Sequence, residues 1–339
     1  MSPMCQYSAI DGTVNDWHLV HLGSRAVGGT GLIIAEMTNI SPEGRISLGC
    51  AGMYKPEHVD AWRRIVDFVH THSDAKIALQ LAHAGRKASC EVAWKGGGPL
   101  PSTERWEILG PSAIPFSPDS QIPRQMNEDD MERIQKAFAQ GAIWAEEAGF
   151  DMLEIHGGHG YLISSFISPL SNTRNDIFGG PLDNRMRFPI SVYNAVRENW
   201  PENKPISMRI SAYDWVEGGT EVDDAVQIGK MMKEIGLDIL DVSSGNVTSD
   251  ARPRADGLFQ TPFSERVRKE AGIPTMTVGN VGGPKQINDV IAEGKADLCC
   301  MAKGQLFDPY FGVHAARTLE INEGWPNQYT AAGFFQPVE

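Results

Sequence analysis

Short apolar runs rich in β-branched residues alternate with longer amphipathic stretches along the chain. Seven runs are typical of buried strands, at residues 31–37, 76–82, 152–156, 206–211, 239–244, 275–280 and 298–303. Helical patterns lie between them at 56–72, 127–148, 184–200, 221–235 and 284–293, several of them opened by an Asn, Asp or Pro start signal. This alternation predicts repeated βα units around a parallel sheet.

The ends of the runs favour a closed barrel over an open doubly wound sheet. In a barrel, functional side chains come from the ends of many strands, whereas an open sheet concentrates them at one switch point. The runs here end at Met37, Gln80, His156, Arg209, Ser244, Gly279 and Lys303, most of which are polar or glycine. The only candidate for an eighth strand, at residues 1–4, is unusually short. We therefore predict an α/β fold, a (β/α)8 TIM barrel with a truncated first strand, in one domain over residues 1–339.

Charge and composition narrow the classes of partner. The formal net charge is −13 and no Lys/Arg cluster stands out, so we expect a small-molecule ligand and no nucleic acid. No apolar run is long enough to span a membrane, and the N-terminus lacks a signal-peptide pattern, so we expect a cytoplasmic protein. The five cysteines form no C-x-x-C pair, which predicts free thiols.

Three proton-handling side chains follow the strand that ends at residue 156. His156 and His159 offer N–H donors that could together hold an oxygen on which negative charge develops. Tyr161, with an ordinary pKa near 10, could deliver a proton to a strongly basic carbon such as that of an enolate. The alternatives are histidines packed in the core, or two zinc ligands, which would require a third ligand at another strand end.

The last two strands predict a phosphate site. Gly279 follows one of these strands, and Ala302 with Lys303 ends the other, at the two loops where TIM barrels usually bind phosphate. Ordinary turn glycines are the alternative. Arg209 and Gln80 should point into the same mouth, where they could stabilise an anionic, hydrogen-bonding ring, although Arg209 could also be structural. A phosphorylated ring that accepts negative charge indicates flavin mononucleotide (FMN).

Several motifs in order resemble one enzyme family almost from end to end. They are SPMCQYS at 2–8, QLAHAGRK at 80–87, HGGHGYL at 156–162 and SPLSN at 168–172, with glycines at 179–180 and Asn-Arg at 184–185. The combination resembles the Old Yellow Enzyme family of flavin-dependent ene-reductases, and Cys5 with Tyr7 resembles its thermophilic-like subgroup. More loosely, residues 31–54 resemble the reductase half of bifunctional aminobenzoyl-CoA or salicylyl-CoA enzymes.

The resemblance implies a role for each matched position. The implied FMN contacts are Ser2, Pro3, Met4, Cys5, Met37, Gln80, Arg209, Gly279, Ala302 and Lys303. NADPH or NADH would reduce the FMN, and flavin N5 would pass hydride to the β-carbon of an α,β-unsaturated carbonyl compound. His156 and His159 would bind the carbonyl oxygen, Tyr161 would donate the proton and Tyr7 would help to bind the substrate.

The sequence departs from the family pattern at three places. Most of the family's first strand, which would precede Ser2, is missing, so we expect a shortened first strand and leave its effect on FMN binding open. Lys303 replaces a phosphate-binding arginine and so loses the bidentate fork. Residues 328–331 lack the arginine that reaches a neighbouring subunit in the subgroup, so the resemblance implies only a homo-oligomer, a dimer or tetramer.

Two other functions are consistent with the residues alone. One is a metal-dependent TIM-barrel hydrolase with His156 and His159 as ligands. The other is a flavin-poor barrel that acts mainly as an assembly partner.

Overall fold

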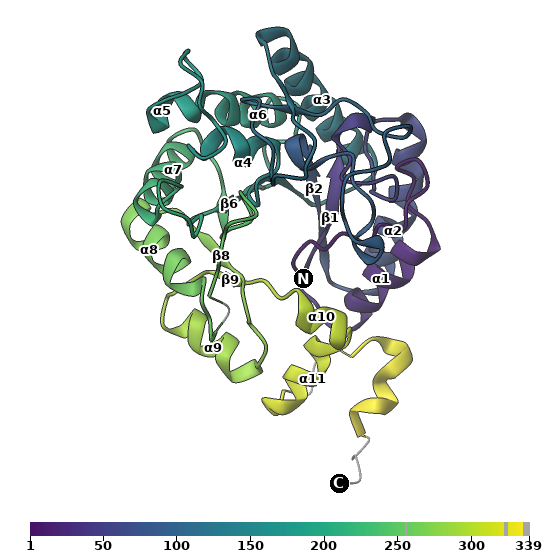
Figure 1. The fold of residues 1–339 in the computed structure, drawn as a ribbon. Coiled ribbons are helices and arrows are strands. Elements are labelled where there is room, and N and C mark those ends of the chain that lie inside the picture. The colour runs from purple at the N-terminus through teal and green to yellow at the C-terminus, as the bar shows by residue number, and fades with distance from the viewer. Residues whose placement is uncertain (255, 322–324, 335–339) are drawn as a thin grey trace.

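The computed structural model describes residues 1–254, 256–321 and 325–334 of the chain. Within these residues, seven parallel strands form one sheet that curls into a ring, with helices on its outer side (Figure 1). In sheet order the strands are β1 (Leu32–Asn39), β2 (Lys76–Ala82), β5 (Met152–Gly157), β6 (Ile206–Ser211), β7 (Ile239–Ser243), β8 (Thr275–Thr277) and β9 (Leu298–Cys299). All seven predicted runs are confirmed as strands, and the predicted TIM-barrel fold is confirmed.

The last two strands are shorter than predicted. Residues Gly279 and Asn280 have φ angles of +106° and +52°, which an extended strand cannot accommodate, so β8 ends at Thr277. The pairing of β9 with β8 is correspondingly limited to two residue pairs.

The first two residues lie between β1 and the segment that follows β9. The Met1 ammonium donates to Leu32 O at 2.6 Å, and Ile34 N donates to Met1 O at 3.0 Å, which is the hydrogen-bond pattern of a parallel neighbour of β1. On the other side, Ser2 N donates to Met301 O at 2.9 Å, just beyond β9. The structure assigns no strand to residues 1–4, where a short first strand is predicted, but three backbone hydrogen bonds of Met1 and Ser2 connect β1 to the end of the sheet.

The helices cover the outside of the barrel (Figure 1). Those that the structure describes are α1 (Asp16–Val27), α2 (Pro56–His72), α3 (Glu128–Glu147), α4 (Leu162–Ile167), α5 (Leu182–Arg185), α6 (Arg187–Arg197), α7 (Val222–Glu234), α8 (Thr261–Ala271), α9 (Pro284–Ala292), α10 (Lys303–Phe307) and α11 (Phe311–Thr318), with 3-10 turns η1 (Pro42–Gly44), η2 (Gly85–Lys87), η3 (Ala93–Lys95) and η4 (Asn327–Phe334). None of these helices is both long and apolar enough to cross a membrane.

Most predicted helices are confirmed, and the differences are of two kinds. The predicted helix at 184–200 is divided at Met186 into α5 and α6. The structure also has helices that the pattern does not predict, namely α1, α4, α8, α10 and α11. In α1 the buried face includes His18, His21 and Arg25, so polar residues interrupt the apolar pattern that a buried helix face normally shows.

The two long excursions contain short elements of their own. Residues 83–126 hold η2, η3 and a two-stranded sheet of β3 (Leu109–Gly110) and β4 (Arg124–Gln125), and residues 157–183 hold α4 and the start of α5. Both excursions follow the carboxyl ends of strands, β2 and β5 respectively, so they lie on the face where a barrel carries its site.

Polar side chains fill the centre of the barrel at one level. Arg209 Nε on β6 lies 3.4 Å from Asp241 Oδ2 on β7, and both side chains are almost fully buried. Glu154 on β5 accepts from Gln80 Nε2 at 2.8 Å and from Ser207 Oγ at 3.0 Å. Because a buried charge is costly unless it is paired, these groups depend on one another.

Replacing Glu154 with Gln should change how stability depends on pH. Burial and then the negative charge of Asp241 raise the pKa of Glu154 from 4.5 to about 8. The folded protein therefore keeps a proton that the unfolded chain releases above its own pKa. Stability should fall as pH rises from about 4.5 to about 8, with a slope of up to about 1.4 kcal/mol per pH unit from this group.

The Glu154→Gln variant cannot titrate here, so the free energy of unfolding should fall less steeply over this pH range. Urea unfolding followed by circular dichroism at several pH values measures the slope. Glu234→Gln, at the exposed end of α7, is the matched control and should keep the wild-type slope. An unchanged slope in Glu154→Gln would contradict a raised pKa for Glu154.

Candidate functional site

A cavity of about 400 Å3 lies at the carboxyl ends of the strands. This volume is within the range of small-molecule and cofactor sites, roughly 300–1,000 Å3. The predicted site residues that line it are Ser2, Pro3, Cys5, Met37, Gln80, His156, His159, Tyr161, Arg209, Ala302 and Lys303. Residues far apart in the chain thus meet around one space, as a barrel requires.

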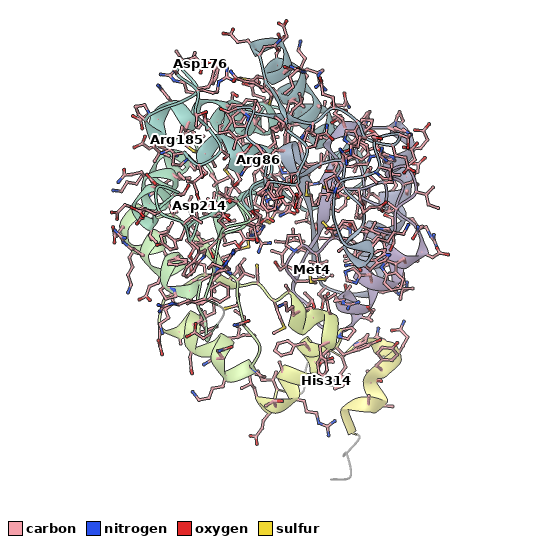
Figure 2. All side chains as sticks on the ribbon, in the orientation of Figure 1. Met4, Arg86, Asp176, Arg185, Asp214 and His314 are labelled. Carbon is pink, nitrogen blue, oxygen red and sulfur yellow. The ribbon has the colours of Figure 1, made fainter. Side chains whose placement is uncertain are left out.

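Three predicted site residues do not line this cavity. Met4, which is labelled in Figure 2, packs against the main hydrophobic core. Tyr7 lines a neighbouring chamber. At Gly279 a Cβ would lie 2.6 Å from Gln260 Nε2 and 3.0 Å from the Phe259 ring, so this glycine allows a close approach of the 259–260 segment.

The floor of the cavity carries the Arg209 guanidinium. Its Nη1 donates to Ser2 Oγ at 3.0 Å, which ties the N-terminal segment to β6. Burial disfavours its charge, but the carboxyl groups of Asp241 and Glu154 outweigh this effect and raise the pKa of Arg209. The guanidinium is therefore charged at the pH of any enzyme assay.

The two imidazoles stand next to each other with their planes nearly perpendicular. Their ring centroids are 5.2 Å apart at an interplanar angle of 88°. Burial first, and the positive charge of Arg209 second, lower the pKa of both His156 and His159 well below the ordinary value. Both rings are therefore neutral at pH 7, and each carries one N–H.

Hydrogen bonds orient each imidazole. His156 Nδ1 accepts from Gly158 N at 3.3 Å, so the proton of the neutral His156 ring is on Nε2. His159 Nε2 lies 2.7 Å from Ser243 Oγ, and a serine hydroxyl can either donate or accept. When Ser243 donates, His159 carries its proton on Nδ1.

A sharp turn presents His159 and Tyr161. His159 has φ +59° and Gly160 has φ +74°, two consecutive left-handed residues that begin two positions after the end of β5. A Cβ at Gly160 would lie 2.4 Å from Asn246 O, so only glycine fits between the loops that follow β5 and β7. His159 N also donates to Ser211 Oγ at 2.8 Å, which holds the turn against β6.

Tyr161 is next to the His156 imidazole and is held in its neutral form. Its ring centroid is 4.9 Å from that of His156. Burial, and then the neighbouring thiol of Cys5, raise the pKa of Tyr161 well above the ordinary value. Burial likewise raises the pKa of the Cys5 thiol. All five cysteines, Cys5 included, are unpaired, which confirms the predicted free thiols.

The charge of the lining suits an anionic ligand. Among the described residues, the cavity lining includes the cations Arg209 and Lys303 and contains no Asp or Glu. Gln80, Ser2, Ser243 and the imidazoles add hydrogen-bonding groups beside apolar side chains such as Met37. This combination fits the predicted FMN, whose phosphate and ring edge are polar while the ring faces are apolar.

Sequence reasoning missed the contribution of the segment after β7. Asn246, Pro253, Phe259 and Gln260 line the cavity but belong to no recognised motif. Gln260 Oε1 accepts from Ser244 Oγ at 2.8 Å and lies 3.2 Å from Ser243 Oγ, whose single proton can go either to Gln260 or to His159. In the sequence, the polar end of the 239–244 run was the only signal that indicated a contribution from this region.

The alternative of a metal site needs a third ligand beside His156 and His159. In the part of the chain that the structure describes, no group of three His, Cys, Asp or Glu side chains is placed to hold a metal ion.

Comparisons with known proteins agree with the flavin interpretation. Residues 1–322 match the model of the NADH:flavin oxidoreductase / NADH oxidase family. The chain is 45% identical to the NADPH dehydrogenase of Geobacillus sp. (strain WCH70) over 321 residues, which are 94% of this chain and 89% of that protein.

Solved structures bear on the fold. Morphinone reductase superposes with a TM-score of 0.79 at 24% identity, over 100% of this chain and 89% of that one. A 2-naphthoyl-CoA reductase superposes with a TM-score of 0.84 at 22% identity, over 96% of this chain, which spans 50% of the length of that enzyme.

The family match covers most of the chain, and the identity to the NADPH dehydrogenase extends over nearly all of it. The chain therefore belongs to the NADH:flavin oxidoreductase / NADH oxidase family, the Old Yellow Enzyme family, and is an FMN-dependent oxidoreductase that uses NADPH or NADH.

Proposed function

We propose that the protein is an ene-reductase that reduces the carbon–carbon double bond of α,β-unsaturated carbonyl compounds. The observation that carries this proposal is the neutral imidazole pair beside a protonated tyrosine, in a cavity with a charged guanidinium. Bound FMN would supply the two-electron chemistry, accepting hydride from the nicotinamide and delivering it to the β-carbon of the alkene. The side chains of this protein must bind the cofactor, hold the carbonyl and supply a proton.

Residues on the floor and on one side of the cavity would bind the cofactor. Arg209, with Gln80 and Ser2, would hold the polar edge of the ring, where the fixed positive charge favours a reduced, anionic form. Lys303, with the backbone of Ala302, would bind the phosphate at the other end of the cavity. Cys5 lines the same cavity as a neutral thiol and would tune the redox potential of the ring by packing against it.

The imidazoles would bind the carbonyl oxygen of the substrate. His156 donates from Nε2, since its Nδ1 is already an acceptor. His159 donates from Nδ1 when the Ser243 hydroxyl donates to its Nε2, while Ser244 satisfies Gln260. Two N–H groups on one oxygen polarise the double bond and stabilise the charge that develops as the β-carbon accepts hydride.

Tyr161 would then deliver a proton to the α-carbon. The O–H bond breaks, a C–H bond forms, and the tyrosinate recovers a proton from solvent. Because burial makes the tyrosinate strongly basic, this recovery is favourable. Tyr161 also lines the neighbouring chamber, as Tyr7 does, and Tyr7 would contact the substrate from that side.

The proposed activity is tested directly with cyclohexenone. The purified protein with FMN and NADPH, kept under nitrogen, should convert cyclohexenone to cyclohexanone with one NADPH oxidised per product, measured by gas chromatography and absorbance. Loss of NADPH in air, with no saturated ketone formed under nitrogen, would contradict the proposal and indicate an NADPH oxidase instead.

Tyr161→Phe should separate the two half-reactions. Reduction of the bound flavin by NADPH needs no proton from Tyr161 and should keep its rate within about twofold. Alkene reduction should slow by about 10²- to 10⁴-fold, the usual worth of a general acid. Stopped-flow absorbance measures each half-reaction, with Tyr54→Phe, outside the cavity, as the control. Equal slowing of both would remove Tyr161 as the acid.

Lys303→Met should weaken FMN binding. Loss of a charge-assisted contact to the phosphate typically costs about tenfold or more in affinity. Quenching of flavin fluorescence during titration of the apoprotein gives the Kd. Lys285→Met on α9, an exposed lysine that does not line the cavity, is the matched control. An FMN affinity unchanged in Lys303→Met would place the phosphate elsewhere.

A further inference from the structure

A second chamber of about 410 Å3 adjoins the cavity under the 83–126 excursion. Tyr161 lines both spaces, so the chamber opens beside the group proposed to donate the proton. Its other walls include Tyr7, Phe116, Arg86 and Lys87. The chamber therefore shares the Tyr161 side chain as a wall with the cavity, and it combines aromatic rings with two cations.

Lys87 is held in this wall by neutral groups. Its Nζ donates to His159 O at 2.8 Å and to Asn246 O at 3.2 Å. The same ammonium lies 4.4 Å from the centroid of the Phe116 ring and 4.8 Å from that of Tyr161. An ammonium has three N–H donors, so these two bonds leave one for another acceptor.

Arg86 beside it also lacks an anionic partner. Its guanidinium donates to the carbonyl oxygens of Ile114, Pro115 and Val247, and its buried Nε makes no hydrogen bond. Arg86 is 2% exposed. Asp214, labelled with Arg86 in Figure 2, acts on Arg86 only through its charge, because its carboxylate is bound by Ser168 and Thr220.

The carboxylates of the chamber leave these cations unpaired. Glu91 and Asp119 line it as well, and Asp119 is exposed at its edge. Among the described residues, neither Lys87 nor Arg86 forms an ion pair with a carboxylate. Two neighbouring cations in a partly buried, aromatic chamber therefore carry charge that the protein does not balance by contact. An uncompensated charge in such a position is costly, and an anionic ligand would remove that cost.

We propose that this chamber binds a carboxylate-bearing aromatic tail of the substrate, with the carboxylate on Lys87 and the ring between Tyr7, Phe116 and Tyr161. The inference rests on the proposed ene-reductase function, since it assigns the substrate class of the same site. The preferred substrates are then unsaturated carbonyl compounds joined through an aromatic ring to an acid group.

Two further observations agree with this assignment. Burial, with Arg86 adding its repulsion, lowers the pKa of Lys87 to about 7, so a bound anion would restore the charged form. Trp94 packs edge-on against Tyr7, with ring centroids 5.8 Å apart, and so extends the aromatic surface beyond the residues that line the chamber.

The test compares para-carboxybenzylideneacetone with its methyl ester, which replaces the negative charge with one methyl group and leaves the rest of the molecule unchanged. The wild-type enzyme should have a KM about ten- to hundredfold lower for the acid, with similar kcat, because the contact is made equally before and during reaction. The saturated ketone products should show the same ratio of Kd values in calorimetric titrations, which do not depend on turnover.

Lys87→Met should remove this ratio and Lys87→Arg should retain most of it. Because acid and ester are compared within one variant, any general effect on His159 cancels. Lys95→Met, an exposed lysine on η3 outside the chamber lining, should keep the wild-type ratio. Equal affinity of the wild type for acid and ester would overturn the inference, as would a ratio that survives in Lys87→Met. The cyclohexenone assay tests the proposed ene-reductase function independently of the chamber, because cyclohexenone has neither an aromatic tail nor a charge.

Discussion

The buried charge of Arg209 is the constraint on which the site depends. A guanidinium inside a barrel needs compensating charge and hydrogen-bond acceptors, and these come from Asp241 on β7 and Ser2 in the N-terminal segment. Through Glu154 and Gln80 the same level of the barrel includes β5 and β2. The cation therefore fixes the floor of the cavity by requiring four strands and the N-terminal segment to present polar groups at one depth.

The positive charge of Arg209 also affects the protonation state of the two imidazoles. Arg209 adds to burial in keeping His156 and His159 neutral, so each imidazole offers an N–H without adding positive charge to the mouth. Two neutral imidazoles can donate hydrogen bonds to a carbonyl oxygen and can also stabilise the negative charge that develops on that oxygen during a reaction. The Asp241 carboxyl group beside Arg209 maintains this arrangement, since without it burial would disfavour the charge of the guanidinium.

The strands and the placement of most site residues could be predicted because they depend on local patterns. Apolar runs marked the sheet, and motif residues such as His156 and Gln80 lie on strands whose ends must converge. Contacts between distant segments could not be predicted. The closure of the sheet by Met1 and Ser2 depends on partners near Leu32 and Met301, and no sequence pattern shows such pairing. Gly279 matched a phosphate-loop pattern, but it lies against Gln260 outside the cavity lining.

Two parts of the barrel mouth differ in how well they can accept a larger side chain. Gly160, in tight contact with Asn246, lies in one part, and the glycines after Trp94 lie in the other. On one side, no side chain can be added without separating the loops that carry His159 and Tyr161. On the other, the glycines at 96 and 98 that follow Trp94 have open space where a Cβ would stand, although φ +103° at Gly96 still favours glycine there. New substrate ranges should therefore arise by remodelling the Trp94 side while the reactive groups stay unaltered, which makes residues 93–98 the natural region for directed evolution of this enzyme.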